Sequence, residues 1–263
     1  MPTAKIGDIK LNYVIEGSGD WLVLIGGYAS GHWQSWTRYL PGLAKSYRVL
    51  AFDSRGSGAS DAPDHPYTVQ MMATDTLGLM DHLGIERAHL LGRSLGGCIA
   101  QETALQRPQC VRSLVMTSTF ARMGQRGKVL VQHWIDTVRE LGFPKFFEHL
   151  MTYFFTADYY DRNFAEVQRA VSGLLSTPRT VHGFVNTGHA VVNHDTWDRL
   201  GGIRCPTLLL CGAEDLITPA AHSEAIGERI PNAEVRIVPR AAHGFLTERP
   251  ASFDLIPEFF GRH

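Results

Sequence analysis

Short apolar runs alternate with amphipathic segments along most of the chain. Six runs rich in Val, Ile and Leu predict buried strands at residues 21–25, 48–52, 89–91, 111–116, 207–211 and 234–238. Apolar side chains that recur on one helical face predict helices at residues 68–83, 95–106, 219–230 and 245–260. Residues 6–12 are expected to add an edge strand. This alternation indicates an α/β fold with a mainly parallel central sheet, flanked by helices on both faces.

The alternation stops between residues 120 and 199. No stretch of this segment has the pattern of a buried strand of the parallel sheet, and helical patterns replace it. The segment also holds half of the aromatic residues of the chain. These side chains either pack a small core of their own or face a pocket, and both can hold for different faces. We expect residues 1–119 and 200–263 to form the core, and residues 120–199 to form a helical cap inserted into it.

Composition and charge limit the class of partner. The 263 residues are 44% hydrophobic and 19% charged, which suits one large globular domain or a domain with an insertion. The formal charge of −1 excludes a global basic field that would attract nucleic acid or anionic lipid. No apolar run approaches the ~18 residues of a membrane span, and residues 1–8 lack the apolar stretch of a signal peptide. We expect a cytoplasmic protein with a small-molecule partner, and a homo-oligomer is possible.

Neither the cysteines nor the histidines indicate a metal site. The four cysteines are unevenly spaced and are expected to be reduced core thiols: Cys98, Cys110, Cys205 and Cys211. Three histidines of the insertion lack the spacing of a pair on one helical turn and have no Glu between them: His182, His189 and His194. The basic stretch of Arg122, Arg126 and Lys128 has no interleaved aromatic residues and is interpreted as a solvated helix start.

Ser94 lies at the centre of the strongest motif of the chain. Gly92-Arg93-Ser94-Leu95-Gly96 follows the predicted strand 89–91 and opens the predicted helix 95–106. A serine between strand and helix requires a very sharp turn, and the two glycines remove the Cβ atoms that would collide with the neighbouring backbone. The motif therefore predicts a serine hydroxyl exposed at the carboxyl edge of the sheet. The spacing of a phosphate-binding glycine loop is absent here.

A serine nucleophile needs a base and a group that orients the base. Asp215 follows the predicted strand 207–211, and His243 follows the predicted strand 234–238. Parallel strands place their carboxyl ends at one edge of the sheet, so Ser94, Asp215 and His243 can converge. Glu214 is the competing acid, and it could instead cap the following helix. The order Ser, Asp, His fits the order of the hydrolase triad.

With these residues, nearly the whole chain resembles the α/β-hydrolase superfamily, and more narrowly its serine carboxylesterases and lactonases with a helical lid. The resemblance rests on residues 92–97, on residues 212–219, on His243 with Glu248 and Pro250, and on the loop 52–60. In the family that loop is structural, so its glycines are not a nucleotide site. Within it, Asp53 and Arg55 are expected to form a pair that holds the loop.

The resemblance also implies an oxyanion hole. Leu95 N–H, directly after the nucleophile at a helix N-terminus, is one donor, and Tyr28 N–H is implied as the other. The sequence departs from the family pattern at Gly26, which replaces a histidine that normally braces this loop. Trp33 and Trp36 follow and are expected to pack the next helix, with pocket lining as the alternative.

These residues predict a cofactor-free serine hydrolase that forms an acyl-enzyme on carboxylic esters or lactones. His243 must be neutral to act as base, so activity should fall as the pH drops through roughly 6 to 7. Phe120, Trp134 and Leu216 are expected to line a pocket for a small to medium, mostly apolar substrate. Carbon–carbon bond hydrolysis and cofactor-free perhydrolysis use the same triad, and a few proteins of this fold act as non-enzymatic small-molecule receptors. These alternatives stay open from sequence.

Overall fold

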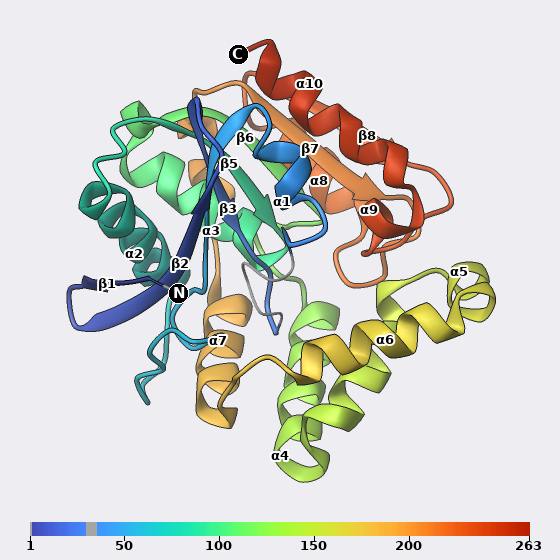
Figure 1. Ribbon diagram of the computed structural model, residues 1–263. Coiled ribbons are helices and arrows are strands. Elements are labelled where there is room, and N and C mark those ends of the chain that lie inside the picture. The colour runs from blue at the N-terminus through green and yellow to red at the C-terminus, as the bar shows by residue number, and fades with distance from the viewer. Residues whose placement is uncertain (1, 30–35) are drawn as a thin grey trace.

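The computed structural model describes residues 2–29 and 36–263, which form one mixed sheet with helices on both faces (Figure 1). The strands are β1 (Thr3–Ile6), β2 (Ile9–Glu16), β3 (Asp20–Ile25), β4 (Tyr47–Phe52), β5 (Ala88–Arg93), β6 (Val111–Thr117), β7 (Thr207–Gly212) and β8 (Ala233–Val238). Their order is β1-β2-β4-β3-β5-β6-β7-β8. The pairs β1/β2 and β2/β4 are antiparallel, and the other pairs are parallel. The α/β prediction is confirmed, and all six predicted strands are present. The prediction that 234–238 is buried is wrong, because β8 lies at the edge of the sheet and only its Val238 is buried.

The predicted edge strand at residues 6–12 is wrong as a single strand. The chain forms a hairpin instead, in which β1 and β2 are joined at Gly7 and Asp8 and Ile6 pairs with Ile9. Gly7 has a φ of +59°, a conformation that glycine adopts at little cost. Apolar residues on both sides of this short turn gave the appearance of one continuous strand.

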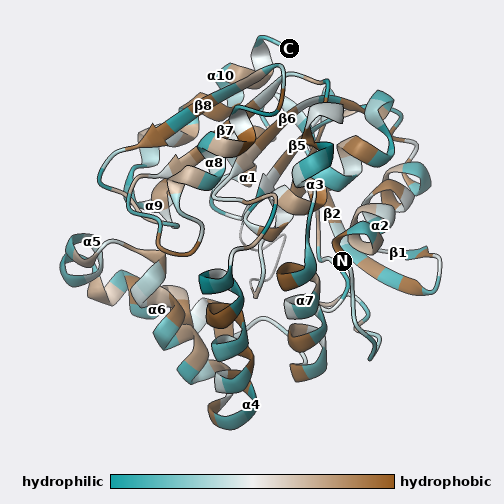
Figure 2. Ribbon diagram, turned by 180° about the vertical axis from the view of Figure 1, so that it is seen from behind, coloured by the Kyte–Doolittle hydropathy of each residue, from teal (hydrophilic) through white to brown (hydrophobic). Residues whose placement is uncertain are grey.

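Alternate side chains of the central strands pack into two core layers. In β3, Val23 and Ile25 belong to the layer that also contains residues of α2 (Val69–His82), α3 (Leu95–Gln106) and α8 (Ala220–Gly227). Leu22 and Leu24 point to the opposite layer, with α1 (Leu40–Leu43) and α10 (Leu255–Gly261). The strands inside the sheet are accordingly brown in Figure 2, as expected for a sheet that is covered on both faces.

The helix predicted at residues 245–260 is broken into three pieces. These are α9 (Phe245–Glu248), a 3-10 turn (Pro250–Asp254) and α10. Arg249 has φ −130° and ψ 73°, outside the helical region. The ring of the following Pro250 disfavours helical geometry at the preceding residue, so the chain cannot continue as one helix. The predicted helices at 68–83, 95–106 and 219–230 are present with small differences at their ends.

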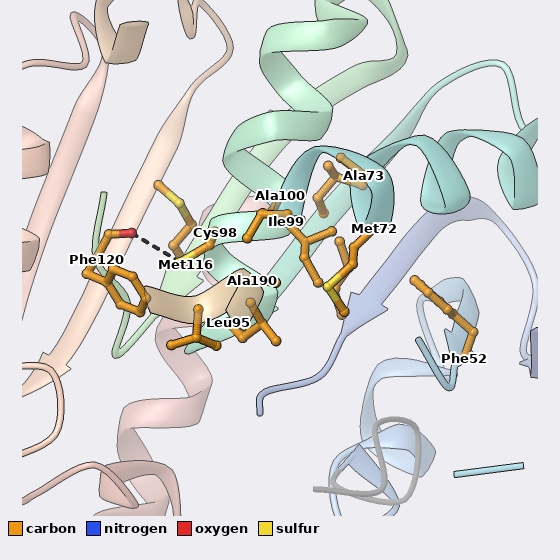
Figure 3. Close-up of a cluster of buried hydrophobic side chains, with 14 of the residues drawn as sticks. Phe52, Met72, Ala73, Leu95, Cys98, Ile99, Ala100, Met116, Phe120 and Ala190 are labelled. Atoms are coloured by element: carbon orange, nitrogen blue, oxygen red, sulfur yellow. Dashed lines mark hydrogen bonds between the residues drawn. The ribbon is translucent and has the colours of Figure 1, made fainter. Parts of the chain in front are cut away.

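The insertion is helical. It contains α4 (Gln125–Phe154), α5 (Ala157–Arg162), α6 (Phe164–Leu175) and α7 (Val181–Asn193), which lie together below the sheet in Figure 1. Helix α4 is kinked at Gly142, which has a φ of +80°, two residues before Pro144. We call these four helices the cap. Figure 3 shows Ala190 of the cap packed beside Leu95, Met116 and Phe120 of the core.

The predicted pairing of Asp53 with Arg55 is wrong. Arg55 instead forms two hydrogen bonds to Asp75 of α2, at 2.5 and 2.7 Å. Asp53 accepts hydrogen bonds from Asn12 Nδ2 at 3.1 Å and from Ala59 N at 2.9 Å. Both residues hold the loop, but each uses a partner that is distant in sequence. Of the two tryptophans, Trp36 is fully buried in the core, and Trp33 lies outside the described residues.

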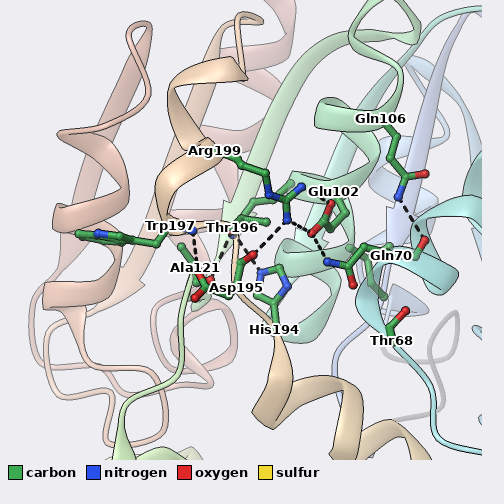
Figure 4. Close-up of polar contacts among 12 residues, drawn as sticks. Thr68, Gln70, Glu102, Gln106, Ala121, His194, Asp195, Thr196, Trp197 and Arg199 are labelled. Atoms are coloured by element: carbon green, nitrogen blue, oxygen red, sulfur yellow. Dashed lines mark hydrogen bonds and ion pairs between the residues drawn. The ribbon is translucent and has the colours of Figure 1, made fainter.

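Polar contacts join the returning end of the cap to α3 (Figure 4). The guanidinium of Arg199 forms two hydrogen bonds with Glu102, whose side chain is almost fully buried. Thr196 Oγ1 donates to Gln101 Oε1 at 2.5 Å. Nearby, Arg122 forms an ion pair with Asp195 at 2.6 Å. The basic stretch at the start of the cap is therefore half exposed at Arg122, as predicted, and also binds the segment that follows α7.

His194 makes the stability of the protein depend on pH. Burial, with a further contribution from Arg199, lowers the pKa of His194 to about 4. Between that value and the ordinary pKa of about 6.5, the unfolded chain binds a proton that the folded chain does not bind. The free energy of unfolding therefore falls as the pH drops through this window, by about 2 kcal/mol at about pH 5 from this residue alone.

In His194→Gln the free energy of unfolding should therefore fall about 2 kcal/mol less than in the wild type between about pH 7.5 and 5. Urea unfolding of both proteins at the two pH values measures this difference, and groups common to both proteins cancel. An equal fall in the two proteins would show that His194 is not the group responsible.

Candidate active site

Ser94 lies on a strained turn between β5 and α3. Its φ of 53° and ψ of −119° are in a region that residues other than glycine rarely adopt. Ser94 N donates to Thr117 O at 2.8 Å, and Ser94 O accepts from Thr119 Oγ1 at 2.8 Å. These bonds to the neighbouring strand β6 and its loop hold the turn, so the serine projects at the carboxyl edge of the sheet.

The glycines on either side of Ser94 are required by close backbone contacts. A Cβ at Gly92 would lie 2.3 Å from Gly96 O, and a Cβ at Gly96 would lie 2.1 Å from Ile25 O. The second contact means that α3 begins directly against the end of β3. The sequence-based reason for both glycines is thus borne out by distances in the fold.

Gly96→Ala should destabilise the protein by at least about 2 kcal/mol and lower activity, because the added methyl meets backbone rather than a flexible side chain. Chemical denaturation and initial rates measure the two effects. The matched control is Gly173→Ala in α6, where a Cβ would have open space. That change should stabilise the cap by about 0.5–1 kcal/mol. Equal effects of the two substitutions would refute the packing argument.

Asp215 and His243 are paired. His243 Nδ1 lies 2.8 Å from Asp215 Oδ2, and both side chains are almost fully buried. Glu214, the competing acid, is exposed, whereas Asp215 is buried. Burial acts to raise the pKa of Asp215, but His243 and hydrogen bonds from Thr218 outweigh it, and the pKa lies below its ordinary value. Asp215 is therefore held as a carboxylate beside the imidazole.

Thr218 and Glu248, for which the sequence indicated no role in the site, hold Asp215 and the loop of His243 in position. Asp215 Oδ1 accepts hydrogen bonds from Ile217 N at 2.9 Å and from Thr218 N at 2.8 Å, and Thr218 Oγ1 donates to Oδ2 at 2.9 Å. Glu248 Oε1 accepts from Ala242 N at 2.7 Å, while its Oε2 accepts from Thr156 Oγ1 of the cap at 2.7 Å. Glu248 thus links the loop of His243 to the cap, a role that its place in the motif could not show.

Ser94 and His243 line one cavity of about 280 Å³ between the core and the cap. Its walls are mostly apolar and come largely from α4 and α6: Trp134, Phe146, Phe147, Leu150, Met151, Phe154, Phe155, Val167, Ala170 and Leu174. The ring of Phe154 lies 5.4 Å from the ring of His243, between centroids. Aromatic side chains of the cap thus cover the edge of the sheet at which Ser94 and His243 lie.

The three predicted pocket residues take different positions. Trp134 lines the main cavity and also a smaller one of about 20 Å³, which Phe120 lines together with Ser94 and Leu95. Leu216 is 51% exposed and lines neither cavity, and its carbonyl accepts from Arg126 Nη1 at 2.6 Å. Ile217 lines both cavities instead, because the turn held by Asp215 directs that side chain inward.

Tyr28 and Leu95 are the two residues whose backbone N–H groups the family resemblance implies as oxyanion-hole donors. Both residues line a cavity with Ser94, and neither N–H donates a hydrogen bond to another group within the part of the chain that the structure describes. The phenol of Tyr28 donates to Phe184 O of α7 at 3.0 Å, and its ring stacks on Phe184 at 4.5 Å. The cap therefore fixes the Tyr28 loop, where Gly26 replaces the bracing histidine of the family.

Other structural findings bear on the remaining sequence predictions. The four cysteines are free thiols. His182 Nε2 lies 2.8 Å from Ala62 O, and His194 is buried rather than on the surface. In residues 2–29 and 36–263, no group of three or more His, Cys, Asp or Glu is arranged to hold a metal ion. None of the helices described is both long and apolar enough to cross a membrane.

Comparison with known proteins agrees with this geometry. Residues 20–250 match the family model of the alpha/beta hydrolase fold. The chain is 28% identical to 3-oxoadipate enol-lactonase 2 of Acinetobacter baylyi, over 96% of this chain and 93% of the other. It is also 28% identical to a protein of Caulobacter sp. strain K31 that is provisionally named carbamate hydrolase RutD, over 88% and 87%.

Among solved structures, a thermophilic esterase from Thermogutta terrifontis is similar, with 26% identity and a TM-score of 0.89 over 100% of this chain and 99% of the esterase. The matched family model spans β3 to the residues after His243, and so includes the turns that carry Ser94, Asp215 and His243. This chain belongs to the alpha/beta hydrolase fold family.

Proposed function

We propose that this protein is a serine hydrolase that cleaves carboxylic esters or lactones through an acyl-enzyme. The observation that carries the proposal is the arrangement of Ser94 and His243 on one cavity, with His243 paired to a buried Asp215 carboxylate. This is the arrangement that activates a serine hydroxyl.

In the proposed mechanism, His243 Nε2 takes the proton of Ser94 as its Oγ attacks the substrate carbonyl. The N–H groups of Tyr28 and Leu95 donate to the oxyanion. His243 then gives its proton to the departing alkoxide, and a water attacks the acyl-enzyme with His243 again as base. The Asp215 carboxylate accepts the Nδ1–H bond throughout, which keeps Nε2 free as the base and stabilises the imidazolium.

The cavity supports a small to medium substrate with apolar parts. Its volume of about 280 Å³ lies at the small end of ligand pockets. The names of the relatives, a lactonase and an esterase, support oxygen esters as substrates, and the provisional name of the third relative makes carbamates worth testing. We therefore expect esters and lactones with short acyl chains to be the best substrates.

Trp134 should limit the length of the acyl chain. Its side chain lines both the main cavity and the smaller one beside Phe120, so its removal should enlarge the space next to Ser94. Trp134→Ala is expected to shift the preference within a p-nitrophenyl ester series toward longer acyl chains. Trp197→Ala, which removes a tryptophan stacked on Arg229 outside both cavities, is the control. An unchanged preference with a lower melting temperature would assign Trp134 to packing alone.

Hydrolysis of p-nitrophenyl esters from acetate to octanoate, together with a simple lactone and a phenyl carbamate, tests the proposal. We expect multiple turnovers on esters or lactones, with an optimum at short chains. Absence of turnover on all of them by folded protein would overturn the proposal.

A further inference from the structure

Arg93 places a cation on the wall of the catalytic cavity. The residue immediately precedes Ser94, and its side chain lines the same cavity as Ser94 and His243. Its guanidinium lies over the ring of Phe154, with Cζ 4.9 Å from the centroid, and that ring in turn contacts His243. Arg93 therefore lies close to Ser94 and His243 within a mostly apolar wall.

This cation has no carboxylate partner. Among residues 2–29 and 36–263 no Asp or Glu forms an ion pair with Arg93, and residues 1 and 30–35 contain neither Asp nor Glu. The other arginine on the cavity, Arg38, is different: it is half exposed and lies 3.9 Å from Glu166. Arg93 is thus an uncompensated positive charge, and Arg38 is not.

Such a cation is costly to the folded protein. Burial lowers the pKa of Arg93, and Tyr39 and Asp215 only partly offset this effect. A partly buried charge without a carboxylate partner normally destabilises a fold, so its presence at a ligand cavity indicates a partner that arrives with the ligand. An arginine fork matches a carboxylate, to which it can donate two parallel hydrogen bonds.

We propose that Arg93 binds a carboxylate of the substrate, so that the preferred substrates are esters or lactones that carry a second, ionised carboxylate group. This inference rests on the proposed ester and lactone hydrolysis and names its substrate class. The apolar side chains around Arg93 would pack on the carbon chain between the carboxylate and the scissile carbonyl, while the guanidinium fixes its end. A charge-assisted pair in such a site should favour the anionic substrate by about 10- to 100-fold in kcat/KM.

Two pairs of substrates test this inference. Monoethyl adipate and ethyl hexanoate have acyl groups of equal length that end in a carboxylate or a methyl group. The butanoyl ester of 6-hydroxyhexanoate and hexyl butanoate place the same difference on the alcohol. For at least one pair, wild-type protein should prefer the anion by about 10-fold or more. If the neutral esters are hydrolysed but neither anion is preferred, the inference fails and the proposed function stands. If no ester of either pair is hydrolysed, the proposed function fails first.

The preference for the anionic ester is measured as the ratio of its kcat/KM to that of the neutral ester of the same pair. Arg93→Met should remove most of this preference, and Arg93→Lys should retain part of it. An effect of Arg93 through the field at His243 would change both members of a pair equally, so the ratio separates the two roles. Arg169→Met is the matched control and should leave the ratio within about twofold, because Arg169 is exposed on α6 and does not line the cavity.

Thermal unfolding completes the test. Arg93→Met should melt at the same temperature as the wild type or higher, because it replaces a partly buried charge that has no carboxylate partner with an apolar side chain. A lower melting temperature together with an unchanged ratio would show that Arg93 has a packing role against Phe154, and would overturn the inference.

Discussion

Ser94→Ala is expected to lower kcat/KM for ester hydrolysis by about four orders of magnitude or more. The hydroxyl is the nucleophile in the proposed mechanism, and the N–H groups of Tyr28 and Leu95 alone would leave only a small residual rate. The fold should be retained, because alanine keeps the Cβ that already occupies the strained turn at φ 53°. Melting temperature and initial rates on a p-nitrophenyl ester measure the two effects.

The control for this substitution is Ser172→Ala, which removes an exposed serine hydroxyl from α6 of the cap. Its rate should stay within about twofold of the wild type. A Ser94→Ala protein that retains more than about a hundredth of wild-type activity would show that hydrolysis does not depend on acylation of this serine.

Asp215→Asn is expected to lower kcat by about three to four orders of magnitude. Oδ1 of Asp215 accepts two backbone N–H groups, from Ile217 and Thr218, so an asparagine must keep its oxygen at that position. The amide NH₂ would then face His243 Nδ1, which could only accept a hydrogen bond. The proton of the neutral imidazole would move to Nε2, the position that must be free to act as base.

Initial rates and the melting temperature of Asp215→Asn measure this effect, and Glu214→Gln is the matched control in the adjacent position. Because Glu214 is exposed and Asp215 is the carboxylate that contacts His243, substitution of Glu214 should leave kcat within about twofold. A large loss in Glu214→Gln with little loss in Asp215→Asn would reverse the assignment of the acid.

The sequence could predict the sheet and the residues at its edge because both depend on local patterns. A run of apolar residues marks a buried strand, and a polar residue directly after it lies at the carboxyl edge wherever the strands are parallel. For the same reason, the positions of Ser94, Asp215 and His243 followed from strand ends. The order of the strands within the sheet does not change which residues lie at that edge.

Features that depend on contacts between distant segments could not be predicted in the same way. Arg55 pairs with Asp75 rather than Asp53, since the pairing depends on how α2 packs against the loop. Ile217 rather than Leu216 lines the cavity, because backbone bonds to Asp215 set the direction of each side chain. Pro250 indicates a break in the helix at the residue before it. The apolar residues of 245–260 recur with a helical period, however, and this period favoured one continuous helix.

For Arg93, the sequence gives the position but not the surroundings that make the residue informative. Its position beside Ser94 was known from the motif, but the absence of a carboxylate partner is a property of the whole fold. A charge is informative only when its surroundings are known, because most arginines are paired or solvated.

Trapping the acyl-enzyme tests the central claim most directly. The protein is mixed with excess p-nitrophenyl butanoate, quenched in acid within the first turnovers and digested for mass spectrometry. The mechanism predicts one butanoyl group on the peptide that contains Ser94, and none on that peptide in Ser94→Ala. Rapid turnover of the ester without acylation of Ser94, or with the acyl group on another residue, would contradict the proposed mechanism.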